Sequence, residues 1–100
     1  MLTKVTNWGP RHTTRNEAFN AQSDGSSAWW FDIKGNPVAK GCGIELDSER
    51  IRTTINNKAG VISARVSGDR LQAVLDKPGN HSIKLRCGEK IHDIGLFTVK

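Results

Sequence analysis

The stretch from Pro78 to Lys100, PGNHSIKLRCGEKIHDIGLFTVK, decides the fold class of this chain. It starts with a turn, continues with alternating apolar and polar residues, turns again at Gly-Glu-Lys and ends in a Phe-x-Val strand. In the alternating segment, Ile83, Leu85 and Cys87 take every second position. A period of two places one face of a strand in a core and the other in water. The stretch therefore predicts a β-hairpin that closes a sandwich.

Turn signals rich in Gly, Pro, Asn and Asp recur at short intervals along the rest of the chain. The segments between them are short and mostly alternate, which is typical of an all-β sandwich or barrel. One segment, Leu71–Leu75, is too brief to assign to a helical turn or to a strand. We expect strands near Thr3–Val5, Ala28–Ile33, Gly43–Asp47, Arg50–Ile55, Val61–Val66, His81–Cys87 and Ile91–Val99.

The aromatic cluster in the second expected strand divides between two faces. Trp29, Phe31 and Ile33 share one parity, so we expect them to point into the core together. Trp30 then faces the other way, where it is either covered by the polar segment 13–27 or exposed as an interface anchor. Within that segment, Phe19 is the expected plug into the core.

Composition is that of one globular domain spanning residues 1–100, with 36% hydrophobic and 25% charged residues. No run approaches the roughly 18 apolar residues of a membrane span. The first residues also lack the long apolar stretch of a signal peptide, so we expect a cytoplasmic or virion-associated protein rather than a secreted one. The net charge of +5 admits nucleic acid or an acidic partner, although the basic residues are scattered and form no block.

Two groups of residues form a family-like pattern. Gly79-x-His81-x-Ile83-x-Leu85, Gly88-x-x-Ile91 and Phe97-x-Val99 stand near the C-terminus, and Val5-x-x-Trp8-Gly9-Pro10 stands near the N-terminus. Together they resemble the closing hairpin and first strand of immunoglobulin-like domains of the filamin and IPT/TIG kind. The chain differs from antibody-type domains because it has no tyrosine. The resemblance implies an all-β, immunoglobulin-like β-sandwich of about seven antiparallel strands that binds proteins or acts as a spacer.

The two cysteines share the inward parity of their strands. If the strands containing Cys42 and Cys87 are antiparallel neighbours, one register sets these residues opposite each other. The same register sets Glu45 opposite Lys84 as a favourable charge pair on the outer face. We therefore hypothesise that the two thiols lie close together. Two buried free cysteines are the simpler interpretation, and a disulfide is the alternative that this register leaves open.

We expect no enzyme activity, no metal and no cofactor. The sequence has no C-x-x-C or H-x-x-x-H pairing to organise a metal site. A reactive thiol needs an electropositive and accessible setting, whereas parity places both cysteines inside. His92 and Asp93 are adjacent strand residues and point to opposite faces, so they do not form an acid–base pair. Histidines on the surface or in turns are the expected arrangement.

These observations favour a non-catalytic protein-interaction or structural module, with a larger assembly such as a phage or cell-surface structure as one setting. Another protein is the expected partner, and the sites are Trp30, Arg11 and Arg15. The alternative function is a basic nucleic-acid-binding β domain, with Trp30 as its only stacking platform. The basic face of that alternative consists of Arg50, Arg52, Lys84 and Arg86.

Overall fold

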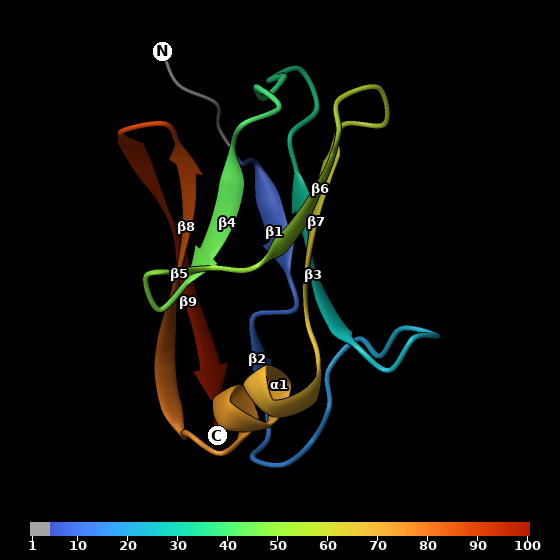
Figure 1. Cartoon of the computed structure of the whole chain (residues 1–100), viewed down its shortest axis with the longest axis vertical. Helices are drawn as coiled ribbons and strands as arrows, with labels where there is room; N and C mark the ends of the chain where they lie inside the picture. Colours follow the sequence, from blue (N-terminus) through green and yellow to red (C-terminus); the bar gives the residue numbers. More distant parts are fainter. Residues whose placement is uncertain (1–4) are drawn as a thin grey trace.

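The computed structural model describes residues 5–100 and contains two packed β-sheets with one short helix across one end (Figure 1). The first sheet has the strand order β1-β3-β7-β6 and the second has the order β2-β9-β8-β4-β5. The elements are β1 Asn7–Gly9, β2 His12–Thr13, β3 Ser27–Asp32, β4 Gly43–Leu46, β5 Glu49–Arg50, β6 Arg52–Asn56, β7 Val61–Val66, α1 Gly68–Leu75, β8 Gly79–Cys87 and β9 Lys90–Val99.

The strand order confirms the expected all-β sandwich. If the two-residue strands β2 and β5 are set aside, the first sheet holds the first, second, fifth and fourth strands in that order, and the second sheet holds the seventh, sixth and third. This is the ABED and CFG arrangement of immunoglobulin domains. The pairing is antiparallel except where β2 runs parallel to β9. The additional strands β2 and β5 extend the second sheet at its two edges.

Most expected strands lie where alternation placed them, and the strand Val61–Val66 is confirmed to the residue. The expected strand Thr3–Val5 lies mostly outside the described residues, and Val5 itself is not in a strand. The expected single strand Arg50–Ile55 is wrong, because the chain changes sheets at Ile51. Ile51 is buried and donates its backbone N–H to Ile44. Its two neighbours in sequence therefore end in different sheets.

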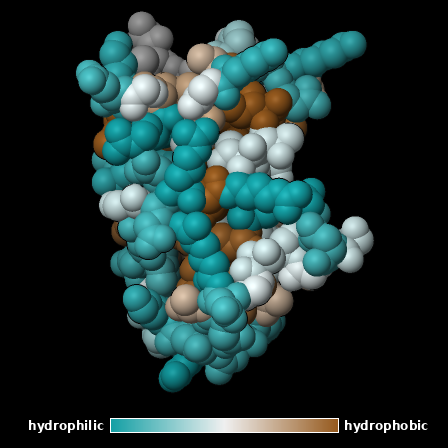
Figure 2. All heavy atoms as spheres, viewed as in Figure 1, coloured by the Kyte–Doolittle hydropathy of each residue, from teal (hydrophilic) through white to brown (hydrophobic). Residues whose placement is uncertain are grey.

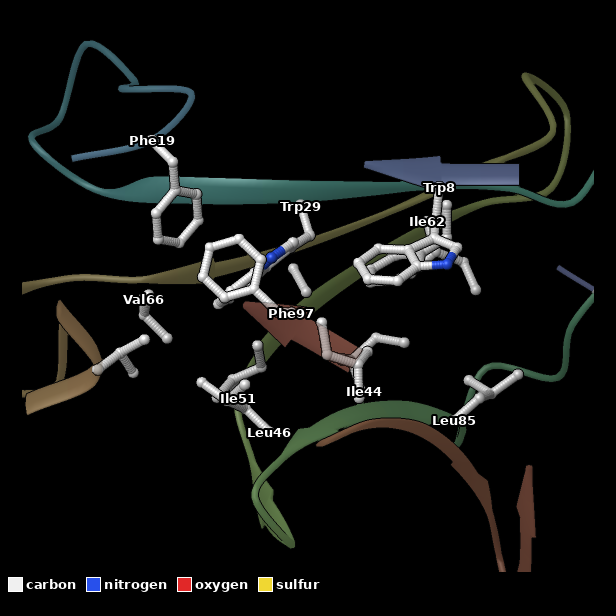
Figure 3. Packing of buried hydrophobic residues seen from close by; sticks show 14 of the residues in the cluster. Trp8, Phe19, Trp29, Ile44, Leu46, Ile51, Ile62, Val66, Leu85 and Phe97 are labelled. Atoms are coloured by element: carbon white, nitrogen blue, oxygen red, sulfur yellow. The ribbon is translucent and has the colours of Figure 1, made fainter. Parts of the chain in front are cut away.

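The core is built around three aromatic rings from three separate parts of the chain (Figure 3). Phe19 lies 4.7 Å from both Trp29 and Phe97, measured between ring centroids. Trp29 meets Phe97 edge to face at 5.1 Å, an arrangement that aromatic quadrupoles favour. The inward parity of Trp29, Phe31 and Ile33 is confirmed, since all three are fully buried. Phe19 is the plug that the sequence predicted.

Helix α1 closes one end of the sandwich where the chain crosses from β7 to β8 (Figure 1). The segment Leu71–Leu75, which the sequence left unassigned, is helical. Val74 and Leu75 point inward and are buried. Leu71 is half-buried and packs against the same core, so burial of these apolar side chains rather than helix propensity holds the helix in place. No helix in residues 5–100 is long and apolar enough to cross a membrane.

The register between β4 and β8 follows the sequence prediction. Glu45 pairs with Lys84 and Gly43 with Arg86, so the next position sets Cys42 against Cys87. The two cysteines form a disulfide across a sequence separation of 45. The hypothesis of a close thiol pair is therefore confirmed, and the interpretation as two free cysteines is wrong. The covalent bond joins the residue before β4 to the last residue of the neighbouring strand β8.

The charge pair predicted on the outer face of this sheet is wrong, although the register behind it is right. The carboxylate of Glu45 accepts a hydrogen bond from Nε of Arg86, not from Lys84. Lys84 instead lies 3.9 Å from the carboxylate of Asp93 on β9. Glu45 is almost fully buried by its neighbours, and a buried carboxylate needs a charged hydrogen-bond donor. The planar guanidinium of the diagonal arginine supplies that donor.

Replacing both cysteines by alanine should lower the free energy of unfolding by about 3–4 kcal/mol, because the disulfide limits the unfolded chain across a loop of 45 residues. Urea denaturation with and without reductant measures the effect. Reduced wild type keeps both cysteine side chains but lacks the covalent bond. It should have nearly the same urea midpoint as Cys42→Ala/Cys87→Ala, which would show that the loss of stability comes from the bond and not from side-chain volume. Equal stability of oxidised wild type and the double variant would show that the bond contributes nothing.

Candidate partner-binding surfaces

Trp30 is the most prominent exposed aromatic side chain in residues 5–100. It lies on the outer face of the first sheet, and 40% of its surface is accessible. Its neighbours across the strands are Gly9 on β1 and Ser63 on β7. A Cβ atom on Gly9 would lie 3.1 Å from Cζ2 of Trp30, so the indole extends over the bare backbone of β1. Small neighbours on both sides leave part of the ring accessible to solvent.

The long loop between β2 and β3 does not cover Trp30. Asn20 donates its Nδ2 to the backbone carbonyl of Ala28, two residues before Trp30, and Ala28 is buried. The loop is also tied to the edge of the same face by Asp24, whose carboxylate lies 3.5 Å from the guanidinium of Arg65. Trp30 is therefore exposed rather than covered, and its role as an interface anchor stays a prediction.

The other two expected partner-binding residues do not join Trp30. The guanidinium of Arg11 lies 4.8 Å from the ring centroid of Trp8, and its Nε donates to the carbonyl of Trp8. Arg15 lies beside the C-terminus, where its backbone N–H donates to Lys100. Within residues 5–100 no hydrogen bond or ring contact links either arginine to Trp30. Arg11 holds the turn between β1 and β2, and only Trp30 stands as a candidate anchor.

The basic face proposed for nucleic acid is divided between the two sheets. Arg52 lies on β6 in the first sheet, opposite Arg65. The other three members, Arg50, Lys84 and Arg86, belong to β5 and β8 in the second sheet. Two of these three are already paired with carboxylates, as described above. The expectation of one continuous basic face is therefore wrong, and Trp30 does not share a sheet with most of the charges.

His81 is buried, which corrects the expectation that the histidines lie on the surface or in turns. Its Nδ1 lies 2.6 Å from Oδ2 of Asp47 and its Nε2 lies 2.8 Å from the carbonyl oxygen of Lys77. Each ring nitrogen therefore faces an oxygen atom within hydrogen-bond distance. Oδ1 of Asp47 also accepts the backbone N–H of Ser82. His81 thus fastens the β4–β5 turn to the segment after α1, with neither ring nitrogen left for substrate.

A shallow cavity of about 290 Å³ lies next to this histidine, between α1 and the β4–β5 turn. Its charged groups are largely matched with one another. Arg70 donates to Glu49 at 3.0 Å, and His81 is paired with Asp47. In the part of the chain that the structure describes, no group of three or more metal-ligating side chains lies together.

Comparison with protein-family models, with curated proteins and with solved structures gives no match. The resemblance to filamin and IPT/TIG domains therefore stays a prediction from the motifs at the two ends of the chain. The outward direction of Trp30 could be anticipated from strand parity, which left open whether the ring is covered or exposed. The role of His81 could not, because its two partners lie 34 and 4 residues away and have no fixed spacing in strand patterns.

Replacing Ser26 by alanine should raise the pKa of Asp24. In the native protein the hydroxyl of Ser26, its backbone N–H and the nearby Arg65 stabilise the carboxylate and lower that pKa. A lowered pKa means that these contacts stabilise the fold above the carboxyl's unfolded-state pKa and are lost as pH falls through its native value. NMR titration of the Asp24 carboxyl group measures the change. Arg65→Gln should shift the titration midpoint of Asp24 less than Ser26→Ala does. An unchanged midpoint in Ser26→Ala would contradict the conclusion that Ser26 lowers the pKa of Asp24.

Proposed function

We propose that this protein is a non-catalytic module that binds a partner protein through the outer face of its first sheet. The exposure of Trp30 is the observation that carries the proposal. Tryptophan is enriched among residues that dominate interface energies, because a large rigid surface is buried at small entropic cost. An exposed tryptophan on the outer face of a sheet, between Gly9 and Ser63, can enter a pocket on a partner without rearrangement of the backbone.

The composition of the surface around Trp30 favours a protein over nucleic acid. Asp32 lies on the same face two residues along β3, and Arg65 on the neighbouring strand is paired with Asp24. The local charge is therefore close to balanced, whereas phosphate recognition requires uncompensated cations. A central aromatic residue within a polar surround matches the composition of transient protein interfaces.

The disulfide supports an oxidising setting for the module. Cystines form and persist in secreted proteins and on cell or virion surfaces, and they are rare in the reducing cytosol. Cys42 and Cys87 are bonded in this fold. This argues for the virion-associated or surface alternative over the cytoplasmic one, and it fits a rigid module that presents a sheet face to another protein.

The proposal predicts that Trp30→Ala weakens partner binding at least about thirtyfold, as expected for an anchor worth about 2 kcal/mol. Tagged wild type and variant would be used to capture partners from an extract of the source organism, with quantitative mass spectrometry as the readout. The partner recovered by wild type would then be titrated against both proteins by calorimetry. The variant should keep the wild-type fold, because the ring packs only against the sheet surface.

Leu96→Ala is the matched control, because Leu96 is 54% exposed on β9 in the other sheet. It should bind the partner as wild type does. Equal affinity of Trp30→Ala and wild type would contradict the proposed function. Loss of binding in both variants would also contradict it, since the effect would then not belong to the first sheet.

A further inference from the structure

A second cavity, of about 440 Å³, opens beside the segment between β3 and β4. It differs from the cavity near His81 in its charge, because two cationic side chains and no carboxylate line it. Its lining consists of Lys40, Cys42, Arg50, Thr53, Ile55, Asn56 and Asn57. The disulfide and Ile55 form an apolar wall, and the two cations provide the charge. Such a combination suits a carboxylate carried on a short apolar stem.

Arg50 is held in place without a carboxylate partner. Its Nη2 donates to the carbonyl oxygens of Cys42 at 3.3 Å and Gly41 at 3.5 Å. The guanidinium lies over Gly43, where a Cβ atom would come within 2.5 Å of Cζ. Glu45 is the residue directly opposite Arg50 on β4, but its carboxylate is bound by Arg86. The guanidinium is thus oriented by backbone oxygens while its charge is left uncompensated.

Lys40 lies in the middle of a short segment that is fixed at both ends. Two residues before it, the backbone N–H and C=O of Val38 are both bound by the side chain of Asn57, each at 2.8 Å. Two residues after it, Cys42 is bonded to Cys87. Neither Lys40 nor Arg50 forms an ion pair within residues 5–100. Fixed backbone positions for both cations reduce the entropy that a ligand must overcome on binding.

The same end of the molecule carries further cations. The loops β3–β4, β6–β7 and β8–β9 all lie at this end, opposite α1 (Figure 1). They contribute Lys34 and Lys58, and Lys90 follows Glu89 of the last turn as the first residue of β9. Seen from the same direction, hydrophilic side chains surround small areas of apolar surface (Figure 2). The positive charge therefore extends beyond the cavity, which favours a ligand longer than a single carboxylate.

We propose that this cavity binds an acidic, extended segment of a partner protein, with one aspartate or glutamate carboxylate between Lys40 and Arg50. Nucleic acid fits the observations less well, because single strands need aromatic platforms on which bases stack. No aromatic side chain lines the cavity: five are buried in the core, and Trp30 lies on the outer face of β3, which strand β7 separates from β6. The site is separate from the Trp30 surface, so either proposal can fail while the other stands.

The test is fluorescence anisotropy with a labelled, N-acetylated hexaglutamate peptide at about 50 mM and 150 mM salt. Wild type should bind this peptide and not the matching hexaglutamine peptide, and the affinity should fall at the higher salt concentration. The variant Lys40→Ala/Arg50→Gln should bind at least about tenfold more weakly. Lys77→Ala removes one cation at the opposite end, beside α1, and should bind as wild type does.

A second variant tests the placement of Arg50 without removing its charge. Gly43→Ala introduces a Cβ atom where the guanidinium lies and should weaken peptide binding severalfold, with little effect on the strand. Circular dichroism confirms that each variant is folded. Equal affinity of wild type and Lys40→Ala/Arg50→Gln would overturn the proposal, as would unchanged affinity in Gly43→Ala. Tighter binding of a labelled 12-nucleotide DNA strand than of hexaglutamate would also overturn it, in favour of nucleic acid.

Discussion

The register between β4 and β8, fixed covalently by Cys42–Cys87, is the constraint on which the rest of the structure depends. A shift of one residue would turn every side chain of β4 to the opposite face, because side chains alternate along a strand. Ile44 and Leu46 would then leave the core, and Glu45 would enter it without a partner. The disulfide stands at the end of the paired segment and excludes this shift for as long as it is intact.

The same register determines which charges are free. It places Glu45 among Arg86, Lys84 and Arg50, three cations that compete for one buried carboxylate. Arg86 binds it, and Lys84 lies near Asp93 on β9. Arg50, the third cation, has no carboxylate partner in residues 5–100 and donates to backbone oxygens at the rim of the cavity beside the β3–β4 segment. An uncompensated arginine is thus a consequence of strand pairing, and it gives the protein a basic site without a basic stretch in the sequence.

Strand parity predicted the parts of this fold that depend on burial. It identified the inward set around Trp29, the outward position of Trp30 and the alignment of the two cysteines, because each requires only the period of two. It did not predict which cation binds Glu45. Register places backbones opposite each other, whereas side-chain length and hydrogen-bond geometry decide between an opposite and a diagonal partner.

Other features depended on contacts that no local pattern shows. The change of sheet at Ile51 follows no turn signal, since the residue is apolar and stays buried while the chain bends around it. His81 is buried because Asp47 and the carbonyl of Lys77 meet it from two separate turns. The prediction of one basic face was wrong for the same reason as the prediction of a single strand Arg50–Ile55. Both assumed that residues 50–55 stay in one sheet. The predicted face consisted of Arg50, Arg52, Lys84 and Arg86.

Peptide mapping by mass spectrometry is the most direct test of the β4–β8 register. Protein produced in an oxidising compartment would be alkylated and digested with trypsin without reduction. Cleavage after Lys40, Arg50, Arg86 and Lys90 releases GCGIELDSER and CGEK. The structure predicts that these two peptides appear as one disulfide-linked species, which separates into its components on reduction. Recovery of both peptides with alkylated thiols from the unreduced, folded protein would contradict the register as the constraint that organises this sandwich.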